Sequence, residues 1–234
     1  SDLPPVPRPM GAGTLVFATL VLCSAFGEVS TGLLVPAMPT LGGLFGATPA
    51  TVQLIIVAFA VAFATGQLVF GPLSDRRGRR TSLLIGAALA LAGSLAAAIA
   101  GDLWTIVAAR SVQGLGAAAG YVVARAIVRD VYGAEGSAAA MALLFALMSA
   151  CFLLAPLAGG VLLDLAGWRA GFAAAALAAA VWGASALLIV PETATARPEP
   201  GAEAAHRVYL GLFAHRGFLA HMIVHAIAYA GLYG

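Results

Sequence analysis

The chain has 234 residues, of which 62% are hydrophobic and 9% are charged, and its mean hydropathy is +0.98. Soluble domains carry roughly 25% charged residues, so this composition excludes an ordinary soluble protein. The formal net charge is +2, and nearly all of the cationic residues, every one of them Arg, lie between apolar stretches rather than along one polar face, which argues against nucleic-acid binding.

Six apolar stretches are long enough to cross a bilayer, which requires about 20 residues. They follow a polar, proline-rich N-terminal tail (1–13) that lacks the layout of a cleaved signal peptide. A polar linker (191–216) comes after the sixth stretch, and a seventh begins in 217–234. The sequence predicts an all-α, polytopic membrane protein whose first bundle covers 14–190, with spans at 14–36, 50–70, 81–100, 103–126, 138–163 and 170–190.

The placement of arginines predicts the orientation of these spans. Arg169 falls on one side of the membrane and Arg110 lies within the fourth span. The others fall on the opposite side: Arg8, Arg76, Arg77, Arg79, Arg80, Arg125, Arg129, Arg197, Arg207 and Arg216. Because Arg and Lys accumulate in cytoplasmic loops, we expect the N-terminus and the linker to be cytoplasmic. The expected location is a bacterial inner membrane.

Glu28 is the acid that lies well inside the first span, about 12 Å from its outer end at 1.5 Å per residue. Ionisable residues within spans face cavities or partners and often carry protons. Glu28 is therefore a candidate proton carrier, and the alternative is a neutral carboxyl that hydrogen-bonds to a neighbouring helix. Its candidate partner is Arg110, at a similar depth in the fourth span.

The segment between the second and third spans holds an unusual set of residues: Gly71, Asp75, Arg76, Gly78, Arg79 and Arg80. A cytoplasmic loop explains the arginines but neither the acid nor the glycines. The pattern Gly-x3-Asp-x2-Gly-x-Arg recurs 89 residues later, at Gly160, Asp164, Gly167 and Arg169, on the opposite side of the membrane. Two copies of opposite topology indicate inverted three-helix repeats, and the alternative is a coincidence in a glycine-rich sequence.

Arg110 is followed by Gln113 and Gly114 in the fourth span. An Arg inside a span costs roughly 2.5–3.5 kcal/mol on insertion scales and faces a polar cavity or a partner. The alternative is that Arg110 extends to the outer surface, since it lies about 9 Å along the helix from Trp104. The fifth span contains Pro156, Gly159 and Gly160, which favour a kinked helix in close contact with a neighbour.

Three further residues are candidates for lining a substrate cavity: Gln53, Tyr121 and Met148. His221 and His225 lie one turn apart in the seventh stretch, but two His without a third ligand do not predict a metal site. The sequence contains no nucleophile–base pair or phosphate loop, so an enzyme is not expected.

Two of these motifs resemble those of the major facilitator superfamily of secondary transporters. The segment 71–80 is similar to its cytoplasmic signature loop, which that family uses in gating. Arg110-x-x-Gln113-Gly114 resembles a motif associated there with proton transfer. The resemblance implies one six-helix bundle built from two inverted three-helix repeats, with the C-terminal bundle missing from this chain.

Other segments are similar to the bicyclomycin- and chloramphenicol-resistance branch of drug:proton antiporters. They include Val35-Pro36-Ala37-Met38-Pro39 and the segment from Val123 through Asp130. The segment from Leu154 through Gly160, with Pro156 and Gly159, resembles the antiporter motif of the superfamily, which marks exporters there. That branch usually carries Asp at the position of Gly32, so Glu28, one turn away, is a candidate substitute. The resemblance implies export of small drug-like molecules driven by a proton gradient without a cofactor; the alternatives are a metabolite importer of the same fold and a non-transporting fragment.

Overall fold

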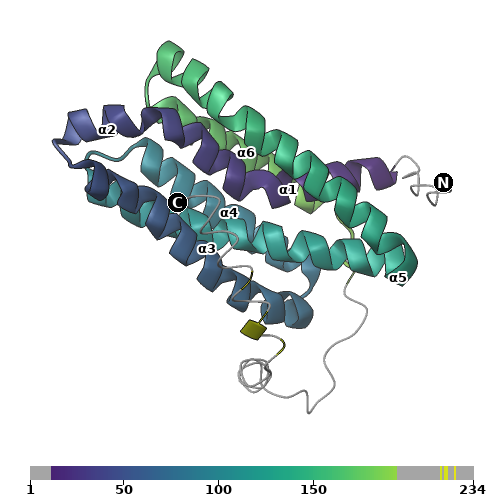
Figure 1. The fold of residues 1–234 in the computed structure, drawn as a ribbon. Coiled ribbons are helices and arrows are strands. Elements are labelled where there is room, and N and C mark those ends of the chain that lie inside the picture. Colours follow the sequence, from purple (N-terminus) through teal and green to yellow (C-terminus); the bar gives the residue numbers. More distant parts are fainter. Residues whose placement is uncertain (1–11, 194–216, 218, 221–223, 225–234) are drawn as a thin grey trace. The chain divides into compact units, whose positions relative to one another are not determined.

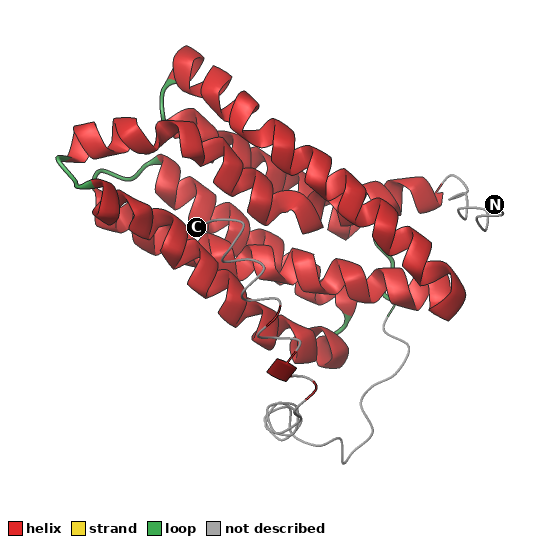
Figure 2. Cartoon of the chain, in the orientation of Figure 1, coloured by secondary structure: helices red, strands yellow, loops and turns green. Residues whose placement is uncertain are grey.

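The computed structural model describes residues 12–193, together with 217, 219, 220 and 224. The chain divides after Thr195 into two units, and the first, Ser1–Thr195, contains the bundle. Figure 2 shows that the described part consists of helices joined by short turns, without a strand. The elements are α1 (Ala12–Leu34), the 3-10 turn η1 (Val35–Ala37), α2 (Met38–Phe45), α3 (Pro49–Arg77), α4 (Arg79–Ala98), α5 (Leu103–Ala166) and α6 (Arg169–Leu188).

Six helical segments are long and apolar enough to cross a membrane, which confirms the predicted all-α, six-span bundle. They are Gly13–Phe45, Pro49–Arg77, Arg79–Ala98, Leu103–Gly133, Glu135–Ala166 and Arg169–Leu188. The expected seventh span falls almost entirely outside the described residues. Helix α5 contains two of the spans, because it doubles back at Gly133, which has φ 64 and ψ −169 (Figure 1). We call these two parts the first and second spans of α5.

Several helices extend beyond the predicted ends. The first span does not end at Pro36, because η1 and α2 continue it to Phe45. Pro36 and Pro39 occupy the first turns of η1 and α2, where the missing backbone N–H is not needed for a helical hydrogen bond. The prediction of a ten-residue loop at 71–80 was also wrong. Helix α3 runs through Pro72 to Arg77, and the next helix starts at Arg79.

The turn between α3 and α4 consists of Gly78 alone. This residue has φ 95 and ψ 153, a conformation open essentially to glycine. Its N–H closes α3 by donating to the carbonyl of Ser74 at 3.1 Å. Gly167, which is 89 residues later, has φ 76 and ψ 179, and its N–H closes α5 on the carbonyl of Leu163 at 2.9 Å. The repeat seen in the sequence therefore has the same backbone form in both copies.

A reciprocal pair of contacts relates the two repeats. Arg80, at the start of α4, donates a hydrogen bond to the carbonyl of Leu187 near the end of α6. Arg169, at the start of α6, donates to the carbonyl of Ala100 just after α4, at 3.1 Å. Helices α4 and α6, the third helices of the two repeats, thus each supply a cation to the C-terminal end of the other. Carbonyls at a helix C-terminus are unsatisfied, and the helix dipole is negative there. This exchange supports the inverted-repeat fold.

Small residues allow the helices to approach closely. A Cβ on Gly93 would lie 2.5 Å from the backbone nitrogen of Gln113, and a Cβ on Gly66 would lie 2.7 Å from the Cβ of Ala118. The first span of α5 is mostly buried, whereas its second span is mostly exposed. The first span of α5 is therefore the centre of the bundle, against which the other helices pack.

Candidate functional site

Arg110 lies at the centre of a polar cluster inside the bundle. Its side chain is fully buried in the first span of α5. The guanidinium donates hydrogen bonds to Ser30 Oγ at 3.4 Å, Thr31 Oγ1 at 2.8 Å and Gln113 Oε1, and its Cζ lies 4.0 Å from the centre of the Phe59 ring. The alternative that Arg110 extends to the outer surface is wrong, because its partners are neutral groups within the bundle.

Gln113 holds the guanidinium in place through a chain of hydrogen bonds. Its Oε1 accepts from Arg110, its Nε2 donates to Ser94 Oγ at 2.6 Å, and that hydroxyl donates to the carbonyl of Ala90 at 2.7 Å. Gln113 is fully buried. Gly114 allows α3 to approach, since a Cβ there would lie 2.5 Å from the carbonyl oxygen of Phe59. The motif therefore fixes the position of a buried cation.

Glu28 lies on α1, half-buried, three residues before the Thr31 that binds Arg110. Residues three apart share a helix face, so the carboxyl projects from the same side of α1. The ion pairs among residues 12–193 are nevertheless Arg79–Asp75 and Arg79–Asp130. The expected pairing of Glu28 with Arg110 is thus not formed in this structure.

The second span of α5 packs so closely on α1 that position 32 has room only for glycine. A Cβ on Gly32 would lie 2.6 Å from the Cβ of Ala155 and 3.3 Å from Cδ of Pro156. A Cβ on Gly159 would lie 2.8 Å from the Cα of Leu33, whereas nothing lies within 4 Å of one on Gly160. The segment from Ala155 to Gly159 therefore packs directly on α1. An Asp at position 32 would require the helices to separate.

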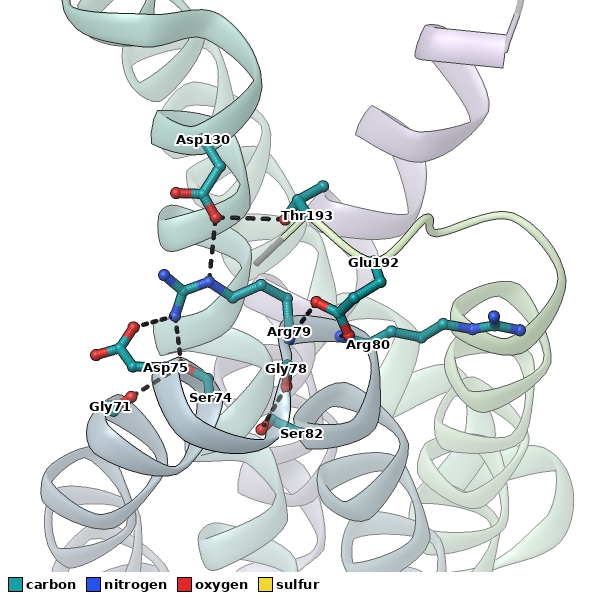
Figure 3. Close-up of polar contacts among 10 residues, drawn as sticks. All are labelled: Gly71, Ser74, Asp75, Gly78, Arg79, Arg80, Ser82, Asp130, Glu192 and Thr193. Carbon is teal, nitrogen blue, oxygen red and sulfur yellow. Dashed lines mark hydrogen bonds and ion pairs between the residues drawn. The ribbon is translucent and has the colours of Figure 1, made fainter. Parts of the chain in front are cut away.

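A second polar cluster surrounds the turn at Gly78 (Figure 3). Arg79 contacts Asp75 at 2.5 Å and Asp130 at 3.1 Å, and it donates to Ser74 Oγ at 2.8 Å. Asp130 also accepts from Thr193 Oγ1 at 3.3 Å. Asp75 pairs locally with Arg79, four residues along the chain. Asp130, which the sequence did not mark as a site residue, joins α5 to this turn.

Glu192, which follows α6, caps the N-terminus of α4. Its carboxylate accepts hydrogen bonds from the backbone N–H of Arg79 at 2.8 Å and of Arg80 at 3.2 Å. Gly78, the N-cap residue, has no side chain to serve this purpose. A Cβ on Gly78 would lie 2.8 Å from Cδ of Glu192, so the glycine also makes room for the carboxylate. Sequence reasoning had placed Glu192 in the linker and missed this contact.

Arg76 and Arg77 are exposed in the last turn of α3.

The candidate cavity residues are not brought together. Gln53 is exposed beside a groove of about 390 Å³ that α2 and the start of α3 form with Met38, Pro39 and Pro49. Tyr121 is half-buried between Phe63 and Arg125. Met148 is 3% exposed within the hydrophobic core, so it does not line a cavity of this bundle.

Residues that could hold a metal ion are not clustered in the described part of the chain. His221 and His225 lie outside the described residues. The two polar clusters described above differ in kind: neutral hydrogen-bonding groups surround Arg110 inside the bundle, whereas carboxylates surround Arg79 at the turn.

Six apolar spans in two inverted repeats, with a buried guanidinium between them, define one bundle of a secondary transporter. Residues 20–234 match the Major Facilitator Superfamily, and the chain belongs to this family. One solved relative, a peptide transporter POT mutant in complex with alafosfalin, has a TM-score of 0.69 and 19% identity, and the match covers 92% of this chain and 46% of that one. This likeness shows the fold.

Curated relatives are closer in sequence. The transporter YdgK of Bacillus subtilis (strain 168), itself uncharacterised, is 36% identical over 168 residues, which are 70% of this chain and 42% of the relative. The chloramphenicol resistance protein of Pseudomonas aeruginosa is 34% identical over 184 residues, or 77% of this chain and 44% of the relative. The chain thus spans less than half the length of these relatives, and the resemblance to resistance transporters is confirmed.

Proposed function

We propose that this chain is the N-terminal half of a proton-coupled exporter of small, drug-like molecules that works by alternating access. The observation that carries the proposal is the buried Arg110, which neutral partners hold in the middle of the bundle, with Glu28 on the facing helix. A charge inside a membrane bundle is costly and marks an ion or substrate pathway. The names of resistance relatives support export.

In this proposal Glu28 carries the proton and Arg110 modulates it. The carboxyl is half-buried, so it can meet water or substrate on one side while α1 shields it on the other. Because Arg110 is bound to Ser30, Thr31 and Gln113, it acts on Glu28 through its field rather than through a fixed ion pair. Substrate and proton would then compete for the Glu28 side of the cavity, and this competition produces antiport.

The second bundle is the proposed partner, because alternating access requires two bundles that move about a central site. The excess of arginines at the Gly78 turn supports a cytoplasmic position for that turn and for the N-terminus. A transporter of this kind is not an enzyme and needs no cofactor beyond the proton gradient. The segment around Pro156 and Gly159 supports export over import because it resembles the antiporter motif of the superfamily.

The test is substrate-induced proton release from the purified full-length transporter that contains this half. Glu28→Gln mimics the protonated carboxyl, so it should abolish proton release and leave the fold intact. The matched control is Glu135→Gln, at an exposed acid that begins the second span of α5. Proton release by Glu28→Gln at the wild-type level would show that coupling lies elsewhere.

A further inference from the structure

The buried hydroxyl of Ser24, on α1, has no hydrogen-bond partner within the described bundle. Its side chain is 3% exposed, and its Oγ is one of the few buried polar atoms there that are unpaired. A buried hydroxyl without a partner is destabilising, so it calls for an explanation. A polar neighbour, the thiol of Cys23, is only a weak acceptor and itself donates to the carbonyl of Leu20 at 3.3 Å. Ser24 thus keeps its hydroxyl hydrogen for another acceptor.

Two other hydroxyls of α1 use their hydrogens differently. Ser30 and Thr31 both donate to the carbonyl of Gly27, at 3.0 and 2.9 Å. Their oxygens are then left to accept, and both accept from the guanidinium of Arg110. A hydroxyl whose hydrogen is already bound suits a cation, whereas one whose hydrogen is free can donate to an anion. By this criterion Ser24 is suited to an anion.

The acid closest to Ser24 along α1 is Glu28. Residues four apart share a face of a helix, and helical side chains point toward the N-terminus. The carboxyl of Glu28 therefore extends over the turn that holds Ser24. The ion pairs of the described bundle belong to Arg79, so none of them engages Glu28. Glu28 is half-buried and Ser24 is buried, so the hydroxyl lies on the enclosed side of the carboxyl.

Other ionisable groups near this face of α1 are few. Helices α5 and α6 pack on α1, and Gly27 brings α3 close to it. Away from the ends of the spans, α3 and α6 carry no ionisable side chain, and those of α1 and α5 are Cys23, Glu28, Arg110, Tyr121, Arg125 and Cys151. The charge of Arg110 favours the ionised form of Glu28 whether or not a hydroxyl stands at position 24. A change at Ser24 alone therefore reports the effect of its hydroxyl.

We propose that Ser24 is a positioning residue for proton exchange at Glu28, and that its hydroxyl donates a hydrogen bond to the ionised carboxylate. A hydroxyl binds a carboxylate more strongly than a neutral carboxyl, so this bond favours the ionised form until a proton arrives. The proton then binds a carboxylate oxygen, and Ser24 keeps its own hydrogen throughout. Ser24 therefore tunes the proton affinity of Glu28 without carrying the proton. This inference rests on the proposed function and adds a residue to its proton site.

The experiment is an infrared titration of the purified full-length transporter, which follows the carbonyl stretch of the protonated Glu28 carboxyl. The band of Glu28 is the one that Glu28→Gln removes, so no substrate is needed. Ser24→Ala should raise the proton affinity of Glu28 about tenfold, which moves the midpoint of the titration up by about one pH unit. Ser24→Thr keeps a hydroxyl and should stay near the wild-type midpoint.

The matched control is Thr19→Val. Thr19 is a buried residue of α1 whose hydroxyl donates to the carbonyl of Leu15 at 2.9 Å, so its loss should leave the Glu28 midpoint unchanged. Unfolding by SDS separates positioning from packing. Because the hydroxyl of Ser24 has no partner within the described bundle, Ser24→Ala should unfold at the same SDS concentration as the wild type or a higher one.

A Glu28 midpoint that stays the same or moves down in Ser24→Ala would overturn the inference. A midpoint that moves as far in Thr19→Val, or a Ser24→Thr variant that titrates like Ser24→Ala, would also overturn it. Failure of the proposed function gives a different result. A protein in which Ser24→Ala moves the Glu28 titration as expected, yet Glu28→Gln still releases protons when substrate binds, keeps this contact and loses the coupling.

Discussion

A methyl group added at Gly78 should destabilise the bundle in two separable ways. The backbone of Gly78 has φ 95 and ψ 153, which strains an L-residue by about 1–3 kcal/mol. The new Cβ would also lie 2.8 Å from Cδ of Glu192 and displace the carboxylate that caps α4. Losing a cap costs about 1 kcal/mol. We therefore expect Gly78→Ala to lower the free energy of unfolding by about 2–4 kcal/mol.

A double-mutant cycle with Glu192→Ala separates the two contributions. Glu192→Ala alone should cost about 1 kcal/mol, the value of the lost cap. Because Gly78→Ala already displaces the carboxylate, adding Glu192→Ala should cost nearly nothing more. The double variant should therefore be about 1 kcal/mol more stable than the sum of the single changes predicts.

The assay is reversible unfolding of the full-length transporter in mixed micelles by titration with SDS. Gly101→Ala is the control, because this exposed glycine has no neighbour within 4 Å of its Cβ position and a φ outside the left-handed region. It should shift the free energy of unfolding by less than about 0.5 kcal/mol. Strict additivity of Gly78→Ala and Glu192→Ala would refute the reasoning, because it would mean that the methyl group and the carboxylate do not meet.

Three further predictions concern the other packed or capped positions. Gly159→Ala should destabilise the bundle by about 1–3 kcal/mol in the same SDS titration while Gly160→Ala stays near wild type, since only the first meets the backbone of α1. Gly32→Asp should lower the midpoint of thermal unfolding more than Gly159→Ala does, because its carboxylate enters the contact with α5. Hydrogen bonds from the Thr105 hydroxyl and N–H lower the pKa of the exposed Asp102, which caps α5. Its stabilisation is therefore present above the unfolded pKa and lost as the pH falls through the folded pKa, so Asp102→Asn should reduce the acid dependence of thermal unfolding below pH 4.

The spans and the repeat could be predicted because the signals for them are local. A run of about 20 apolar residues predicts a helix across the membrane whatever its neighbours are. Gly78 and Gly167 mark turns at the same spacing from an Asp and an Arg, and both adopt a glycine conformation. The ends of the helices were harder to predict from the sequence. Arg76 and Arg77 are polar, which suggested a loop, yet they form the last turn of α3.

The contacts of the candidate site could be predicted only in part. Arg110 and Gln113 were identified together because they belong to one motif, and residues three apart on a helix share a face. The rotation of each helix could not be derived, because apolar residues surround every span and no polar stripe marks the outer face. Met148 was therefore assigned to a cavity although it lies in the core. Glu192 was missed because its partners are backbone N–H groups 113 and 112 residues away in sequence.

The turns at Gly78 and Gly167 share a backbone form, but only the Gly78 turn carries ion pairs. Both turns are built from a glycine with positive φ and an Arg that binds the end of a distant helix. The position of Arg79, however, is occupied in the second repeat by Trp168, which is buried against Phe45 and Phe172. A turn of this form therefore folds without a cluster of ion pairs.

The ion pairs of Arg79 with Asp75 and Asp130 are therefore not required for a turn of this form. These charged side chains lie at the Gly78 turn, and the backbone form of that turn is repeated at Gly167. Glu192, which follows α6, also binds at the Gly78 turn, through the N–H of Arg79. The exporter proposed above would have to distinguish the two sides of the membrane although its repeats are related by symmetry. The two turns of the described bundle differ in this respect: one carries a cluster of charged residues, and the equivalent turn carries the hydrophobic contacts of Trp168.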